Sequence, residues 1–322
     1  MNLTNHEIIS KKLVPKFGDK WTERIASIDI ETVRLVEHYD DLPEDGKTAW
    51  EYKNKQDNII PPYETLTELW DRSASLYPEF SKVVAVSIAF ERDGKMRCKN
   101  ISSTDESELL EELGTTLDNL YDSGFLLMGH SAKYFDFSFL RKRYVISNIH
   151  LPEILDDTGK KPWEVEFLDT NELWKGSSTG PGSSLVALCF ALGVPLSKDG
   201  IDGSMVGKEY YSGNLDKIAK YCGQDAVATF NILKRYINQK IYQFDEVEYI
   251  NAIISTSNEL EKLLNNKKLT PKLKKHIESK ELTEKDKKNL SKLLVAAITE
   301  SGGKAKYQEN INKVEGFLNS LK

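Results

Sequence analysis

Short apolar runs alternate with amphipathic segments over the first 240 residues, and this alternation restricts the chain to a mixed α/β fold. Strands are predicted for residues 24–31, for two runs within 82–102 that flank Asp93-Gly94, for 124–130 and for 165–169. Helices are predicted for residues 63–78, 105–121, 135–147, 183–193 and 215–240. The polar stretch 33–62 contains a Pro-Pro pair and predicts a long loop or insertion. We therefore expect a mixed β-sheet with helices on both faces.

The character of the sequence changes after about residue 245. Residues 251–322 contain 15 Lys and Arg against 9 Asp and Glu, whereas residues 1–250 contain 29 against 41. This contrast predicts three parts: an N-terminal lead-in over 1–24, a main domain over 25–244, and a basic helical C-terminal extension over 245–322. An acidic main domain argues against nonspecific binding of duplex nucleic acid, and it suits carboxylates that collect metal ions.

Composition also excludes several classes of protein. No stretch approaches the roughly 20 apolar residues of a membrane span, and the first 20 residues do not resemble a secretory signal. The three cysteines, Cys98, Cys189 and Cys222, are far apart and form no metal-binding pair motif. They are expected to be free thiols, as in a reducing compartment.

Two carboxylates end the first predicted strand. Because side chains alternate along a strand, Asp29 and Glu31 point to one face while Ile28 and Ile30 point to the other. Neighbouring carboxylates repel, and their burial is costly unless a cation lies between them. The pair therefore suggests a metal site, although solvated acids on an edge strand would give the same pattern.

Three further residues carry the same chemistry. Asp136 follows the strand at 124–130 and stands at or near the start of a helix, where a capping role is equally natural. Tyr221 and Asp225 are four residues apart within the last long helix, so they share one helix face. Each feature alone has an ordinary structural explanation, but the ordered set is specific.

The set Asp-x-Glu, Asp and Tyr-x-x-x-Asp resembles the DEDD superfamily of 3′→5′ exonucleases, in the subclass whose last motif carries tyrosine. The string from Asp29 to Thr32 resembles the first exonuclease motif of family-B DNA polymerases, and the stretch from Ser131 to Asp136 resembles the second. Segments 160–175, 184–207 and 221–230 are similar to stand-alone bacterial and phage exonucleases related to that proofreading domain. The resemblance covers roughly residues 24–240 and implies a ribonuclease H-like fold.

This resemblance implies hydrolysis of a phosphodiester at a 3′ end with two divalent metal ions, Mg²⁺ or Mn²⁺. The metal ligands would be the four acidic side chains: Asp29, Glu31, Asp136 and Asp225. Tyr221 would orient the attacking water through its hydroxyl group. An ionised tyrosine is not needed, since the unperturbed pKa is near 10.

The resemblance also implies contacts with the terminal nucleotide of single-stranded or frayed DNA. The candidates are Thr32, Val33, Ser131 and Phe135. Phe135 is equally well explained as a core residue. Ser131 stands where the family usually has Asn, so we expect weaker placement of the 3′ end or an altered choice of substrate, but not loss of metal binding. Asp169 and His130 are interpreted as a structural cap and a packed, hydrogen-bonded residue.

Such an enzyme is expected in the cytoplasm, in that of a bacterial host if the source is a phage. Since 322 residues leave no room for a polymerase, proofreading would act in trans for a separate DNA polymerase. The basic segment 245–322 is a candidate docking site for that polymerase, or a solvated helical cap. Two alternatives remain: an exoribonuclease that trims RNA 3′ ends, and a catalytically silent replication adaptor.

Overall fold

The computed structural model describes residues 18–56, 65–161, 164–196 and 200–252. The chain divides into compact units at 1–254 and 255–322, and the second unit lies outside the described residues. The predicted helices after residue 252 therefore lie outside them as well.

One six-stranded sheet forms the centre of the described unit, with the strand order β5-β4-β1-β2-β3-β6. The strands are β1 (Ile25–Arg34), β2 (Ser81–Arg92), β3 (Lys95–Ser102), β4 (Leu126–Gly129), β5 (Leu168–Asp169) and β6 (Glu248–Ala252). β2 is antiparallel to both β1 and β3, whereas the pairs β1–β4, β4–β5 and β3–β6 are parallel. Asp93 and Gly94 both have positive φ, which is the backbone of a two-residue hairpin turn.

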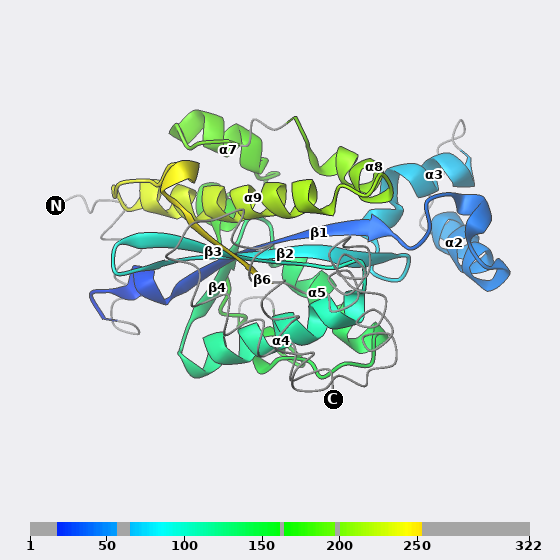
Figure 1. The fold of residues 1–322 in the computed structure, drawn as a ribbon, viewed down its shortest axis with the longest axis horizontal. Helices are drawn as coiled ribbons and strands as arrows, with labels where there is room; N and C mark the ends of the chain where they lie inside the picture. The colour runs from blue at the N-terminus through cyan, green and yellow to red at the C-terminus, as the bar shows by residue number, and fades with distance from the viewer. Residues whose placement is uncertain (1–17, 57–64, 162–163, 197–199, 253–322) are drawn as a thin grey trace, which may run out of the picture. The chain divides into compact units, whose positions relative to one another are not determined.

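Helices cover both faces of the sheet, as predicted (Figure 1). α4 (Glu106–Asp122) and α5 (Asp136–Ile146) lie on one face, and α7 (Leu185–Leu192), α8 (Val206–Tyr211) and α9 (Leu215–Tyr236) lie on the other. Ile28 and Ile30 of β1 pack in the core cluster that contains the leucines of α4. The short helix α6 (Thr170–Lys175) follows β5. This architecture confirms the mixed α/β, ribonuclease H-like fold.

The region predicted as a loop over 33–62 contains a helix, α2 (Glu44–Gln56), so that prediction is wrong for its described part. α2 has few apolar residues, and periodicity therefore gives little signal. Trp50 is fully buried, and its ring lies 5.3 Å, centroid to centroid, from that of Trp70 in α3 (Leu66–Ser73). This tertiary contact stabilises a helix that its own sequence does not predict.

Two boundaries also differ from the predicted three parts. Trp21 is buried in the core, so the end of the predicted lead-in belongs to the main unit. Residues 248–252 form β6, an edge strand, and not the start of a helical extension. A five-residue strand whose pairing partner lies about 150 residues earlier in the chain has too weak a local pattern to be seen in sequence.

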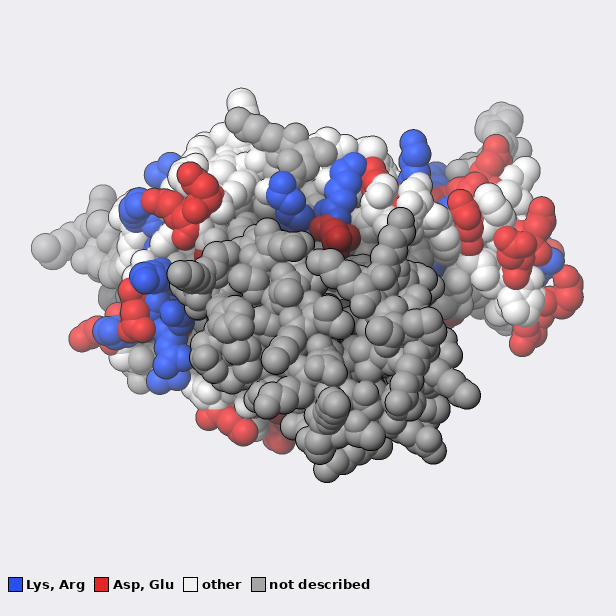
Figure 2. Space-filling view, in the orientation of Figure 1, with Lys and Arg blue, Asp and Glu red and all other residues white. Residues whose placement is uncertain are grey.

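Short 3₁₀ helices connect these elements at Trp21–Arg24, Tyr39–Asp41, Ala74–Leu76, Glu153–Leu155, Gly203–Met205 and Phe244–Glu246. All three cysteines are free, as predicted, and all three are buried. No helix among the described residues has both the length and the apolar character needed to span a membrane. Acidic side chains gather over α2 and α3 on the face shown in Figure 2.

Candidate active site

Strand β1 carries the first two candidate ligands at the centre of the sheet. Asp29 pairs with Ser87 and Glu31 with Ala85 of β2, and the register shifts by a β-bulge directly after Glu31. Both carboxylates are half-buried, while Ile28 and Ile30 are buried in the core on the other face. The alternation predicted from the sequence is therefore observed.

Asp136 is the first residue of α5, as predicted, and only 7% of its side chain is exposed. Its Oδ1 accepts a hydrogen bond of 3.2 Å from the backbone amide of Ile30. This bond ties the start of α5 to β1 between the two strand carboxylates.

Helix α9 supplies Tyr221 and Asp225, and it lies unusually close to the sheet. The thiol of Cys222 donates to the carbonyl oxygen of Asp29 across 3.2 Å. At Gly223, an added Cβ would lie 2.7 Å from Oδ1 of Asn100 in β3, so a larger residue would require the Asn100 side chain to move. These contacts hold Tyr221 and Asp225 beside the carboxylates of β1.

The two carboxylates of β1 are repelled by Asp136 and Asp225, so the four acidic residues form one electrostatic cluster. Burial, then repulsion from Glu31, Asp225 and Asp136, raises the pKa of Asp29 well above its usual value. The pKa of Glu31 is likewise raised well above its usual value by burial and by repulsion from Asp225 and Asp136. Burial raises the pKa of Asp136 to about 7 and that of Asp225 to about 6.

Tyr221 is hydrogen-bonded to Asp225. Burial and the nearby carboxylates raise the pKa of Tyr221 far above its usual value of 10.0. The phenol therefore keeps its proton at neutral pH and acts as a hydrogen-bond donor, as expected from the sequence.

The donor atoms of this cluster suit a hard divalent cation, because all are carboxylate oxygens. Oδ2 of Asp29 is buried and has no hydrogen-bond partner, so an interaction is missing at the centre of the cluster. Within the described residues, no three His, Cys, Asp or Glu side chains are spaced as metal ligands would be. The chemistry of these oxygen atoms fits a metal ion. Coordination requires the carboxylates to lie closer together than they do in this structure.

The structure gives different outcomes for the two predicted substrate contacts on β1. Val33 is completely buried in a core cluster with Val84 and Ile218, so its side chain cannot contact a nucleotide and this prediction is wrong. Thr32 is 9% exposed, and its hydroxyl donates to the carbonyl of Ser75 across 2.7 Å. Its side chain is thus engaged within the protein.

Ser131 begins the turn that leads to Asp136, and its φ of 59° lies in the left-handed region. Its amide donates to Oδ1 of Asp169 at 3.0 Å, and its Oγ accepts from Nδ2 of Asn171 at 2.7 Å. Oδ1 of Asn171 accepts from the amide of Ser183 at 2.9 Å. Ser131 is therefore held by neighbours that its own motif does not contain.

Phe135 is half-buried, and its ring lies 5.4 Å, centroid to centroid, from that of Phe139. It packs against the core while part of it remains accessible. Asp169 caps α6, as predicted, by accepting from the amides of Asn171 and Glu172. Both ring nitrogens of His130 are hydrogen-bonded, and burial lowers its pKa, in agreement with a packed role.

Sequence reasoning missed two residues that support the site. Cys222 lies within the last motif, but nothing in the sequence shows that its thiol hydrogen-bonds to the carbonyl oxygen of Asp29. Asn171 follows the cap residue Asp169, and only the fold brings it to Ser131 and Ser183. Both contacts join elements that are far apart in the chain.

Fold and site together define a ribonuclease H-like protein whose carboxylates lie on β1, α5 and α9. Residues 75–279, more than half of the chain, match the family described as predicted 3′-5′ exonucleases related to the exonuclease domain of PolB, and the chain belongs to that family. The match includes Asp136, Tyr221 and Asp225 but begins after β1. The family match therefore does not bear on Asp29 and Glu31. No curated protein matches the chain.

Proposed function

We propose that this protein is a metal-dependent exonuclease that removes nucleotides from DNA 3′ ends. The observation that carries the proposal is the cluster of four acidic residues on three elements: Asp29, Glu31, Asp136 and Asp225. Repulsion from Asp136 and Asp225 helps to raise the pKa values of Asp29 and Glu31. Family membership supports the 3′-5′ exonuclease chemistry. Membership does not by itself specify DNA as the substrate, and the resemblance of the string Asp29–Thr32 to the family-B polymerase motif favours it.

Each side chain has a role that follows from its surroundings. Asp29, Glu31, Asp136 and Asp225 would hold two Mg²⁺ or Mn²⁺ ions. When bound, such ions supply an activated water and neutralise the developing charge on the phosphate. Asp136 is fixed by the Ile30 amide, so it presents its second oxygen in a constant direction.

Tyr221 keeps its proton and hydrogen-bonds with Asp225. Its hydroxyl can therefore donate to a phosphate oxygen or fix the position of the attacking water, without forming a covalent bond to the substrate. Asp225 fixes the direction of this hydroxyl, so the two residues act together.

The biological role that we propose is proofreading in trans for a separate DNA polymerase. The similarity to the proofreading domain of family-B polymerases supports this role. The basic segment 245–322 is the proposed contact with the polymerase, and it lies almost entirely outside the described residues. Co-purification of full-length protein with a replicative polymerase, compared with a chain that ends at residue 254, tests the contact.

The experiment that tests the activity is a time course with a 5′-labelled single-stranded DNA oligonucleotide. It is run with Mg²⁺, with Mn²⁺ and with EDTA, beside an RNA of the same sequence. We expect a metal-dependent ladder that shortens from the 3′ end of the DNA and is absent with Asp29→Ala. Asp122→Asn, an exposed change at the end of α4, is the matched control.

A ladder on RNA alone would replace DNA by RNA as the substrate and make trimming of RNA 3′ ends the function. No ladder on either nucleic acid would contradict the enzymatic proposal and favour the silent adaptor. Full activity of Asp29→Ala would contradict the site assignment.

A further inference from the structure

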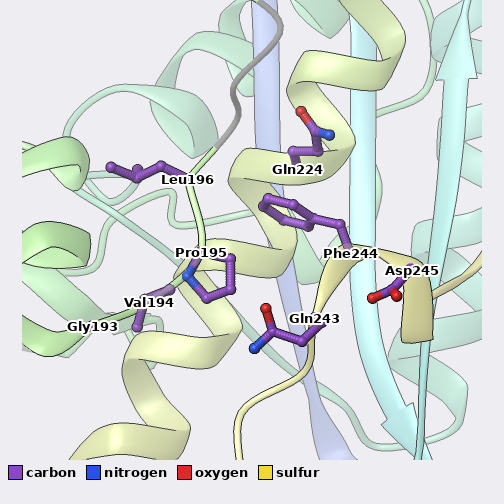
Figure 3. A pocket seen from close by; sticks show the side chains of 8 residues that line it. All are labelled: Gly193, Val194, Pro195, Leu196, Gln224, Gln243, Phe244 and Asp245. Atoms are coloured by element: carbon purple, nitrogen blue, oxygen red, sulfur yellow. The ribbon is translucent and has the colours of Figure 1, made fainter.

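A pocket of about 570 Å³ lies beside α9, apart from the carboxylate cluster. Among the described residues, three parts of the chain line it: the segment from Gly193 to Leu196 after α7, Gln224 of α9, and the segment from Gln243 to Asp245 (Figure 3). None of the residues assigned to the carboxylate cluster lines this pocket. Its lining combines apolar atoms with two carboxamides and a carboxylate.

Gln224 carries the main argument for a ligand. Its side chain is only 7% exposed, and its Oε1 is buried without a hydrogen-bond partner in the protein. A buried acceptor without a partner costs about 1–3 kcal/mol. A ligand that places an N–H group in the pocket would remove this cost once the carboxamide of Gln224 turns its oxygen toward the ligand.

The other lining residues indicate the shape and chemistry of that ligand. In Figure 3 the ring of Phe244 lies between the carboxamides of Gln224 and Gln243, with Pro195 nearby. An aromatic ring offers a stacking surface for a flat molecule, and carboxamides both donate and accept along its edge. A nucleobase has this combination of a flat face and a polar edge.

The position of the pocket connects it to the candidate active site. Gln224 directly precedes Asp225 and lies three residues after Tyr221, which makes Gln224 and Tyr221 neighbours on the surface of α9. Arg235 donates from Nη2 to the carbonyl of Gly193 across 3.3 Å, so a positive charge lies at the pocket's edge. A phosphate group of a bound strand would be attracted there.

We propose that this pocket binds a nucleobase of the nucleic-acid strand whose 3′ end lies at the carboxylate cluster. This inference rests on the proposed function for its substrate. The base would stack on Phe244 and donate an N–H to Oε1 of Gln224. It would belong to a nucleotide upstream of the one that is removed, and it would hold the strand between successive cleavages.

The test compares wild-type protein with Gln224→Met on single-stranded DNA oligonucleotides with one abasic nucleotide at successive distances from the 3′ end. For the wild type, we expect one distance at which loss of the base raises KM about tenfold, as expected for loss of one stacked base. For Gln224→Met, we expect a KM raised about tenfold on intact DNA and no further effect of the abasic position. The melting temperature should stay the same or rise, because an unpartnered acceptor has been removed.

Phe244→Ala provides a second variant with the same expected change in KM, and Phe190→Ala is the matched control. Phe190 is 85% exposed on α7 and does not line the pocket, so its loss should leave KM unchanged. A free nucleoside monophosphate is added as competitor in a parallel series. Strong inhibition that is lost in Gln224→Met, without any abasic effect, would identify a free nucleotide as the ligand and overturn binding of the strand.

Failure of this inference differs from failure of the proposed function. A wild-type protein that cleaves neither DNA nor RNA contradicts the exonuclease function itself. A wild-type protein that cleaves, with KM values unchanged in Gln224→Met and Phe244→Ala, contradicts the base-binding pocket alone.

Discussion

Replacement of Asp136 by asparagine should stabilise the metal-free protein while it abolishes cleavage. The carboxyl group of Asp136 is 7% exposed, and its pKa is raised from 3.8 to about 7, chiefly by burial. Each pKa unit corresponds to about 1.4 kcal/mol, so ionisation of this group costs up to about 4 kcal/mol more in the folded than in the unfolded chain. Asparagine removes this cost, and its side-chain oxygen can still accept the hydrogen bond from Ile30.

The pH dependence follows from the direction of the shift. Since folding raises the pKa of Asp136, its contribution to stability is fully present below pH 3.8, its value outside the fold. That contribution is lost as the pH rises through about 7. In EDTA, the free energy of unfolding of the wild type should therefore fall between about pH 4 and pH 7 relative to Asp136→Asn. At pH 8 the variant should be more stable by about 1–4 kcal/mol.

Urea denaturation followed by the fluorescence of the buried tryptophans measures this difference, at pH 5 and pH 8. Added Mg²⁺ should stabilise the wild type more than Asp136→Asn, since only the wild type has all four of the proposed acidic ligands. Asp122→Asn should change neither value. If Asp136→Asn is less stable than the wild type at pH 8 in EDTA, the argument from burial of the Asp136 carboxylate is refuted.

Three further predictions concern other parts of the molecule. Tyr221→Phe should lower kcat by about 10- to 100-fold, because only one hydroxyl donor is lost. For Asp225→Ala we expect a larger loss of kcat, about 1,000-fold or more. Single-turnover cleavage measures both variants. Ser131→Asn should leave the melting temperature unchanged, since Asn tolerates the φ of 59°. The same variant should lower KM for single-stranded DNA. An unchanged KM would count against a role of residue 131 in positioning the 3′ end. Lys234→Met should destabilise the protein by about 3–5 kcal/mol, because it leaves Glu91, now bonded to Lys234 at 2.8 Å, as an unpaired buried charge. In urea denaturation, the double variant with Glu91→Leu should recover most of that loss.

Much of the fold was predictable because its signals are local. Apolar alternation locates β1, the Asp93-Gly94 turn fixes the hairpin of β2 and β3, and the periodicity of 215–240 locates α9. The helix α2 was missed because Trp50 is stabilised by packing on Trp70, which a local pattern does not contain. The strand β6 was missed because its pairing with β3 is its main support.

The candidate site shows the same division. Residue types and spacing were sufficient to select Asp29, Glu31, Asp136, Tyr221 and Asp225, since each pattern is set within a few residues of one element. The nucleotide contacts were less predictable, because they depend on which side chains are buried in the core. Val33 illustrates this, as it alternates correctly on β1 and is nevertheless enclosed by residues of α8 and α9.

The sequence by itself determined the class of fold and the acidic residues, because strand alternation, helix periodicity and carboxylate chemistry are written within short segments. Only the tertiary structure decided how those acids meet. It placed the thiol of Cys222 on the Asp29 carbonyl and the Ile30 amide on Asp136, and it left Oε1 of Gln224 without a partner beside Phe244. The contacts of Cys222 and of the Ile30 amide join segments that are more than 100 residues apart in the chain. The raised pKa values of the carboxylates depend on burial, which packing produces. Such contacts and such burial exist only after the chain has packed.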